Sequence, residues 1–381
     1  MTHVFTCTKT TVAQSVTMDV GGSLYGFGER GDERQVAFAA LAQAVAAISR
    51  LDAGISHHPL RNPWLRIERE FALAAAAREA GFEADAQSII AARLGAMTLP
   101  RGHVQLGDLD DRARRWAPIA QRKGLAELRA LVAKLAPVRG DRDLVGLAER
   151  TAKALRDCSQ SSWEFDDDPL TGMPLLRNVP AGPGAVDAGD LALALPFALR
   201  RAGVTTTLLS GLVGRPRVFA REEVTPLAAL TSWAATLERQ AGEGAARLRE
   251  LQVYAGQVER QLADVRRPAA LQRLVAVALG SWSVWAAKLA RDTKVDISSA
   301  WRSLEQAADL GLVVEVPGQK RSRGDGTLYA VPTLLRIAGL IAVRPGRPSM
   351  TMLDRDEGVA IGHAVAELEA AMATTGRLLG M

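Results

Sequence analysis

The chain of 381 residues contains 48% hydrophobic residues, only 5% aromatic residues, and a net charge of +5. This length suits two or three domains, and the apolar content is too high for a chain that is disordered as a whole. Ala and Leu are abundant. Because both residues favour helices over strands, we expect a mainly α protein with a multi-helical N-terminal body.

Targeting and membrane signals are scarce in this sequence. Cys7 and Cys158 are the only cysteines, too few for a disulfide framework or a four-cysteine zinc site, which favours a reducing compartment. The N-terminus shows no apolar core followed by a cleavage site. Apolar runs such as Leu191–Leu199 are far shorter than the roughly 20 residues that span a bilayer. We therefore expect a cytoplasmic protein with no membrane partner.

Helices are predicted through most of the first 158 residues, after a polar and Gly-rich lead-in over 1–31. Gly54 and Pro59 mark the end of the first helix, and Pro63 stands near the start of the second, where proline is favoured. The predicted helices cover 32–51, 62–81, 85–94, 111–136 and 141–158, with a loop over 101–111.

The segment 159–189 differs from what precedes it, because it holds several prolines and glycines. This composition predicts a loop or lid with little regular structure. Carboxylates at Asp166, Asp167 and Asp168 are oxygen ligands that suit a divalent cation. No further ligand pattern surrounds them, so we interpret the run as a solvated acidic loop. An apolar helix is predicted over 190–202.

A long helix is predicted from Thr225-Pro226 to Pro268. Its later part repeats apolar residues every three or four positions, which is a short a/d seam. The seam consists of Leu248, Leu251, Ala255, Val258, Leu262 and Val265. It is shorter than three heptads and suits either packing on the helix's own chain or a homodimer. One further amphipathic helix is predicted over 354–379.

The most specific functional signal lies in Leu271–Val331. Helices are predicted over Leu271–Leu279 and Trp285–Asp292, then a turn over 293–295 and a third helix with Asp296 as its N-cap. Two strands, Leu312–Val316 and Thr327–Val331, enclose a Gly-containing basic loop. This order predicts a winged helix-turn-helix with a short β-hairpin wing, a domain that binds double-stranded DNA.

The third helix has two contrasting faces. Apolar residues at helical spacing are expected to face inward: Ile297, Ala300, Trp301, Leu304, Ala307 and Ala308. The opposite face is polar and is predicted to read bases: Ser298, Ser299, Arg302, Ser303 and Gln306. Short side chains allow close approach to a major groove, and an arginine can donate two hydrogen bonds to guanine.

Basic residues are concentrated in the same region. From Pro268 to Pro348 eleven basic residues outnumber six acidic ones, so this segment carries the whole net charge of +5. Lys320, Arg321 and Arg323 in the loop, and Lys294 in the turn, are predicted to contact phosphates, which supplies affinity without sequence reading. The alternative is a winged domain that contacts protein and has a solvated basic loop.

The region resembles bacterial helix-turn-helix proteins at four short motifs: Leu289-Ala290, Val295-Asp296, Arg302-x-Leu304 and Leu310–Val313. Many regulators of this type have a Leu-Gly pair before the valine. This chain has Thr293-Lys294 there, and lysine in place of a left-handed glycine carries a strain cost.

The chain as a whole resembles a family of alphaproteobacterial proteins, often found in rhizobia and on plasmids. They join a helical domain of unknown function to a C-terminal helix-turn-helix domain. The residues that carry this resemblance outside the C-terminal motif are Ser49–Ala53, His58–Leu60, Trp64-Leu65 and Leu195–Gly203. The resemblance implies a DNA-binding regulator with no established activity.

Signals for an enzyme are weak. Gly26–Gly31 fits G-x-G-x-x-G and Asp52 lies about 20 residues further on, but the following residues look helical where a dinucleotide site needs a βαβ unit. His57 and His58 lack metal-ligand spacing, so we interpret them as turn or capping residues. No catalytic residue, cofactor or metal is predicted, and no effector is indicated.

We therefore predict four segments: a helical domain over 1–225, a connecting helix over 226–267, a winged helix-turn-helix over 268–345 and a C-terminal helix over 346–381. The leading function is sequence-specific DNA binding by a transcriptional regulator. One alternative is an enzyme or small-molecule sensor in the helical body that the winged domain targets. The other is an interaction protein of a plasmid-maintenance or toxin–antitoxin system.

Overall fold

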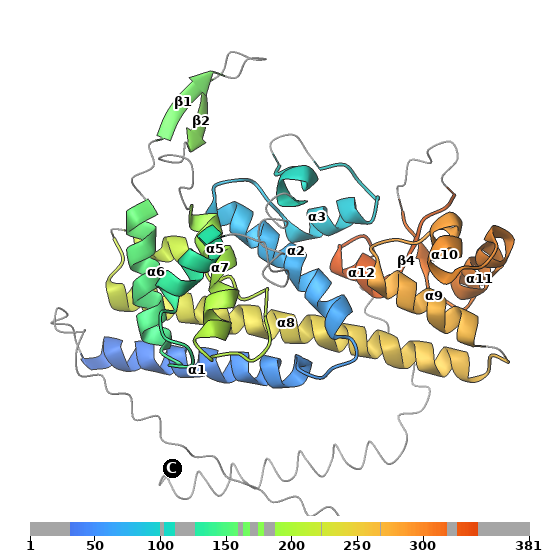
Figure 1. Ribbon diagram of the computed structural model, residues 1–381, viewed down its shortest axis with the longest axis horizontal. Helices are drawn as coiled ribbons and strands as arrows, with labels where there is room; N and C mark the ends of the chain where they lie inside the picture. Colours follow the sequence, from blue (N-terminus) through green and yellow to red (C-terminus); the bar gives the residue numbers. More distant parts are fainter. Residues whose placement is uncertain are drawn as a thin grey trace, which may run out of the picture. The chain divides into compact units, whose positions relative to one another are not determined.

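The computed structural model of this chain describes residues 31–99, 103–110, 126–158, 163–167, 174–178, 187–221, 223–266, 268–317 and 326–341. These residues are mainly helical, as the composition predicts (Figure 1). The chain divides into two compact units. Unit 1 comprises residues 1–84 and 101–249, and unit 2 comprises 85–100 and 250–381.

Unit 1 is built from helices. They are α1 (Gly31–Ile55), α2 (Arg61–Glu79), α5 (Ala126–Leu135), α6 (Leu144–Cys158), α7 (Ala188–Arg201), the short 3-10 helix η2 (Pro216–Ala220) and the first part of α8 (Pro226–Ala263). Helix α7 packs against α2 and α5, and α6 packs against α7 and η2 (Figure 1). Most residues of α7 are buried, so the apolar segment predicted over 190–202 is the central helix of this unit.

Helix α1 corrects the expectation that every apolar run is too short to cross a bilayer. Residues Glu33–Ile55 form a helix that is long and apolar enough, by length and composition, to cross a bilayer. A stretch of 18 residues within it has a mean hydropathy of 1.4, and 44% of that stretch is buried in the protein. The buried residues recur every three or four positions, as on a helix that packs on a core. The hydrophobic ones are Ala37, Leu41, Ala44, Ile48, Leu51 and Ile55, and Asp52 is buried as well.

The segment 159–189 contains a hairpin where a loop was expected. Strands β1 (Trp163–Asp167) and β2 (Pro174–Asn178) pair antiparallel, with Trp163 opposite Asn178 and Asp167 opposite Pro174. The prolines and glycines that suggested a loop lie outside the two strands, apart from Pro174. A proline is tolerated at the first residue of a strand, where its missing N–H matters least. Asp166 and Asp167 therefore belong to a strand, and Asp168 lies outside the described residues.

A buried ion pair ties α2 to α8 within unit 1. The Glu68 side chain is 1% exposed and the Arg247 side chain 12%. The guanidinium donates through Nε to Oε1 and through Nη2 to Oε2 at 3.0 Å, and its Cζ lies 4.0 Å from the centre of the Phe71 ring. A Cβ on Gly211 would overlap the carboxylate, so glycine there makes room for the charge.

A second buried carboxylate holds the loop that follows α7. Asp52 of α1 accepts hydrogen bonds from the backbone N–H groups of Thr206 at 2.7 Å and Thr207 at 2.8 Å, and from the Thr206 hydroxyl at 2.8 Å. Burial raises the pKa of Asp52, but these hydrogen bonds outweigh burial and lower it overall. Asp52, the acidic residue of the dinucleotide motif, is thus engaged within the fold, and Gly26–Arg30 lie outside the described residues.

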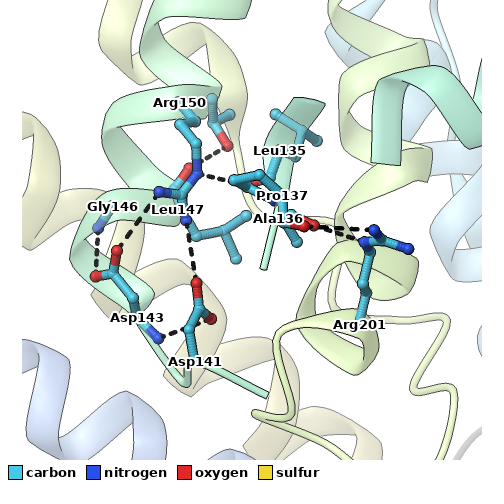
Figure 2. Close-up of polar contacts among 10 residues, drawn as sticks. Leu135, Ala136, Pro137, Asp141, Asp143, Gly146, Leu147, Arg150 and Arg201 are labelled. Carbon is cyan, nitrogen blue, oxygen red and sulfur yellow. Dashed lines mark hydrogen bonds and ion pairs between the residues drawn. The ribbon is translucent and has the colours of Figure 1, made fainter. Parts of the chain in front are cut away.

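Two arginine side chains cap the C-terminal end of α5 by donating to its last carbonyl groups, which have no partner in the helix itself. Arg150 of α6 donates from Nε to the Leu135 carbonyl at 2.6 Å, and Arg201 of α7 donates from Nε to the Ala136 carbonyl at 2.6 Å. Figure 2 shows both guanidinium groups converging on this end from opposite sides. Arg150 also lies 3.5 Å from the Asp143 carboxylate. The three helices α5, α6 and α7 are therefore joined at one polar point.

Unit 2 contains α3 (Ala86–Arg93), the end of α8, α9 (Ala269–Gly280), α10 (Ala286–Thr293), α11 (Ile297–Asp309), β3 (Val314–Glu315), β4 (Tyr329–Ala330) and α12 (Pro332–Ile337). Helix α3 lies within the range predicted for it, 85–94, and Asp85 is its N-cap, because its carboxylate accepts from the Ser88 backbone N–H at 2.8 Å. It contacts α12, which groups residues 85–100 with the C-terminal residues. The division between the units falls inside α8, between residues 249 and 250. The helical domain was expected to end at residue 225.

The apolar seam of α8 is covered by the chain itself. Four of its six residues are less than 10% exposed, namely Leu248, Leu251, Val258 and Leu262, and Ala255 and Val265 are half-buried. Tyr254, which lies between them, donates its hydroxyl to the Leu312 carbonyl at 2.7 Å, and burial raises the pKa of this hydroxyl. This packing favours the first of the two alternatives for the seam. The helix predicted over 354–379 lies outside the described residues.

Candidate nucleic-acid interface

Three helices and a small hairpin form the candidate interface in unit 2. Helices α9, α10 and α11 contact one another pairwise. Strands β3 and β4 pair antiparallel through Val314 with Ala330 and Glu315 with Tyr329. Val284, just before α10, exchanges two backbone hydrogen bonds of 2.8 Å with Tyr329. The hairpin is therefore joined to the start of α10, and both strands are shorter than the expected five residues.

The connection between α10 and α11 is a tight turn centred on a left-handed lysine. Lys294 has φ 58° and ψ 40°, and the Val295 N–H closes the turn by donating to the Ala290 carbonyl at 3.1 Å. The predicted strain at this position is confirmed, since a side chain in the left-handed region costs about 1–2 kcal/mol. The Lys294 side chain is exposed.

Asp296 is the N-cap of α11, as predicted. Its Oδ1 accepts from the Ser299 backbone N–H at 2.8 Å. The hydrogen bonds from Ser299 lower the pKa of Asp296, so the carboxyl stays ionised at neutral pH. A negative charge at this end also offsets the positive pole of the helix dipole.

The inward face of α11 is narrower than the sequence predicts. Ala300, Leu304 and Ala307 are completely buried, whereas Trp301 and Ala308 are half-buried. Ile297 corrects the expectation, because its side chain is 53% exposed. The helical spacing is right, but Ile297 is the first residue of α11, and more than half of its side chain is left uncovered.

The five predicted base-reading residues occupy two environments. Ser298, Arg302 and Gln306 are exposed, and Ser299 and Ser303 are half-buried. The Ser303 hydroxyl donates to the Ser299 carbonyl at 2.9 Å, which is a bond within the helix. Ser298, Arg302 and Gln306 are thus the members of the set that the helix presents to solvent.

Arg302 is held by weak contacts with its own helix. Nε donates to the Ser298 carbonyl at 3.4 Å and Nη2 donates to the Ser299 hydroxyl at 3.3 Å. Both distances are long for hydrogen bonds of this kind. No ion pair of Arg302 is found among the described residues. The guanidinium is therefore pre-positioned on the first two turns and can exchange these contacts for stronger ones.

Charge is distributed unevenly along α10 and α11. Lys288 and Arg291 of α10 both bond to Asp292, at 3.0 and 3.3 Å, and the Arg291 side chain is 72% exposed. The exposed acids of α11, Glu305 and Asp309, lie in its second half. Apart from the cap, the first two turns carry only neutral and cationic side chains. Lys320, Arg321 and Arg323 lie outside the described residues.

Trp301 of α11 contacts Gly326, which precedes strand β4 of the hairpin. A Cβ added to Gly326 would lie 2.9 Å from Cζ2 of the Trp301 indole, so the Gly326 backbone packs directly on the ring. The sequence indicated Trp301 only as a core residue. Its contact with Gly326 joins residues far apart in the chain, and neither residue type signals it.

The structure also bears on the histidine turn and on the possible metal ligands of the sequence. His58 accepts from the Leu60 backbone N–H through Nδ1 at 3.1 Å, which confirms its capping interpretation. Within the described ranges, no group of three or more His, Cys, Asp or Glu residues is placed to hold a metal ion.

Comparison of the sequence with models of known protein families gives no match, and comparison with curated proteins gives none either.

Proposed function

We propose that unit 2 is a winged helix-turn-helix that binds double-stranded DNA, and that the protein is a transcriptional regulator. One observation carries the proposal. The first two turns of α11 present Ser298 and an arginine, Arg302, that no carboxylate among the described residues neutralises. A recognition helix contacts base edges with its N-terminal residues, and arginine bound to guanine O6 and N7 is the commonest specific contact.

The strained lysine in the turn supports the same proposal. A glycine would adopt the left-handed conformation of Lys294 without strain, yet the chain places an exposed cation there. Strained backbone persists where surrounding structure and function maintain it. We infer that the Lys294 ammonium contacts a phosphate beside the groove that α11 enters. In this arrangement Gln306, one turn beyond Arg302, reads an adjacent base, and Ser299 and Ser303 support Arg302.

The hairpin provides the expected second contact. The pairing of β3 with β4 is the base of a wing, and the sequence between them contains Lys320, Arg321 and Arg323. We propose that these three cations contact phosphates of the same duplex. Together with Lys294 they make four phosphate contacts, which corresponds to a slope of log K against log salt of about −3.6 for one chain.

The test uses the full-length protein and a randomised 20-base-pair duplex pool. The most enriched duplex is synthesised with a fluorescent label, and its affinity is measured by anisotropy between about 50 and 200 mM KCl. Arg302→Ala is expected to weaken binding by about 1–3 kcal/mol and to relax sequence preference. Lys294→Ala is expected to weaken all sequences alike and to reduce the salt slope by about one.

Arg260→Ala is the matched control. Arg260 is an exposed arginine of the same unit on α8, and its removal changes the net charge by the same amount as the removal of Arg302. It is expected to leave sequence preference unchanged. The proposal is rejected if no duplex is enriched, or if the affinity does not depend on salt. If a duplex is enriched and its binding depends on salt, recovery of bound DNA from whole cells would identify the regulated sites.

A further inference from the structure

Two aliphatic side chains are exposed beside the proposed reading surface. Val295 is 41% exposed and Ile297 is 53% exposed, whereas Leu289 of α10 and Leu304 of α11 are at most 2% exposed. Val295 and Ile297 flank the cap residue Asp296, so they stand on either side of the point where α11 begins. Each side chain exposes apolar surface to water, and burial of this surface against a partner would be favourable.

Ile297 lies little more than one helical turn from Arg302 along α11, on a different face of the helix. Ile297 is the first residue of α11 and Ser298 is the second. Ile297 and Arg302 are five residues apart, which is about 7.5 Å along a helix axis. That length corresponds to roughly two base-pair steps of a duplex. A base pair within reach of Ile297 therefore lies about two steps from the pair that Arg302 contacts.

We propose that Val295 and Ile297 contact the 5-methyl groups of thymine in the major groove. The inference rests on the proposed DNA-binding function and specifies its target. The thymine methyl is the apolar group that the major groove offers, and it distinguishes A·T from the other pairs there. The target then contains thymine within about two or three base pairs of the guanine bound by Arg302.

The surroundings of the pair favour a duplex over a protein partner. Apolar patches that mark protein interfaces measure several hundred Å² and have a polar rim, whereas only two aliphatic side chains are exposed here, on either side of the Asp296 carboxylate. Arg291 and Lys294 precede them in the chain and Arg302 follows, all three exposed to solvent. These three cations outnumber the two carboxylates of the same stretch, Asp292 and Asp296, and the excess of positive charge suits a polyanion that carries small apolar groups.

The test replaces thymine with uracil, which removes only the 5-methyl group. The duplex most enriched from the randomised pool is made in both forms, and the full-length protein is titrated with each. Burial of one methyl group is worth about a fourfold change in affinity, so the wild-type protein is expected to bind the thymine form about 4 to 16 times more tightly for one or two methyl contacts.

Variants assign the effect to the two side chains. Ile297→Ala and Val295→Ala are each expected to reduce the preference for thymine over uracil while the preference for guanine is retained. Val253→Ala is the control, because Val253 is 56% exposed on α8 of the same unit and its replacement removes the same methyl groups as Val295→Ala. Thermal unfolding of each variant checks that the fold is intact, as expected for side chains this exposed.

The outcomes separate the two proposals. Enrichment of a duplex that is bound equally well with thymine and uracil overturns the methyl contact and leaves DNA binding intact. An enriched sequence that lacks thymine at any fixed position has the same consequence. Failure to enrich any duplex overturns DNA binding and the inference with it. If Ile297→Ala instead abolishes binding of a protein and leaves DNA affinity unchanged, the exposed pair belongs to a protein interface.

Discussion

Removal of Arg247 is expected to destabilise unit 1 severely, because it leaves the Glu68 carboxylate buried without a counter-charge. The Glu68 side chain is 1% exposed, and the two groups bond through both carboxylate oxygens. Breaking a buried pair by removing one partner costs about 3–5 kcal/mol, whereas replacing both partners with apolar residues of similar volume is often neutral or stabilising. Arg247→Met is therefore expected to cost about 3–5 kcal/mol, and Glu68→Leu with Arg247→Met less than about 1 kcal/mol.

The loss in Arg247→Met is expected to depend on pH in a defined direction. Burial raises the pKa of Glu68, and the hydrogen bonds and charge of Arg247 oppose that rise. Without Arg247 the pKa rises further in the folded state, while the unfolded value stays at its ordinary 4.5. A raised folded-state pKa means that the folded state binds the proton more tightly. The stability of the variant therefore falls as pH increases from 4.5 through the raised pKa, by up to about 1.4 kcal/mol per pH unit.

The assay is urea unfolding at 25 °C, followed by tryptophan fluorescence between pH 5 and 8. Trp64 is a local reporter, since it is completely buried and its Nε1 donates to the Gly244 carbonyl of α8 at 2.8 Å. Arg239→Met is the control, because the Arg239 side chain is 64% exposed on the same helix and pairs with the exposed Glu243 at 3.3 Å. A cost below about 1 kcal/mol for Arg247→Met that does not vary with pH would show that water or another group replaces the arginine.

Two further variants test the turn of unit 2 and the polar junction of unit 1. Lys294→Gly relieves the strain at φ 58°, and glycine loses more conformational entropy on folding than lysine does. The net effect is expected to be a stabilisation of about 0.5–1 kcal/mol together with weaker DNA binding. A lower melting temperature than that of the wild-type protein would contradict this reasoning. Arg201→Ala leaves the Ala136 carbonyl at the end of α5 without its 2.6 Å donor and is expected to cost about 1–3 kcal/mol in chemical unfolding. The neighbouring exposed Arg200, replaced by alanine, is the control, and equal losses in the two variants would refute a specific role of Arg201.

Local chemistry let the sequence predict several features that the structure bears out. Ala and Leu content predicts a mainly helical protein. Asp296 acts as an N-cap, as predicted, because a carboxylate three residues before a free N–H reaches it without help from other elements. The left-handed conformation of Lys294 was expected from the resemblance to helix-turn-helix regulators, which have glycine at this position of the turn. In each case the interacting groups lie within a few residues of one another, so the pattern of residues contains the interaction.

Tertiary structure alone decided the contacts between distant residues. Glu68 pairs with Arg247, which is 179 positions away in the sequence, and Asp52 binds Thr206, which is 154 positions away. No periodicity of the sequence signals either pair. A carboxylate on an otherwise ordinary helix is indistinguishable in the sequence from a surface residue. The exposure of Ile297 was missed for the same reason, since helical spacing gives the direction of a side chain but not whether another helix covers it. The β1–β2 hairpin was missed because its turn-forming residues dominate the composition of 159–189. Burial depends on which elements meet in space, and a single sequence does not encode that in local pattern.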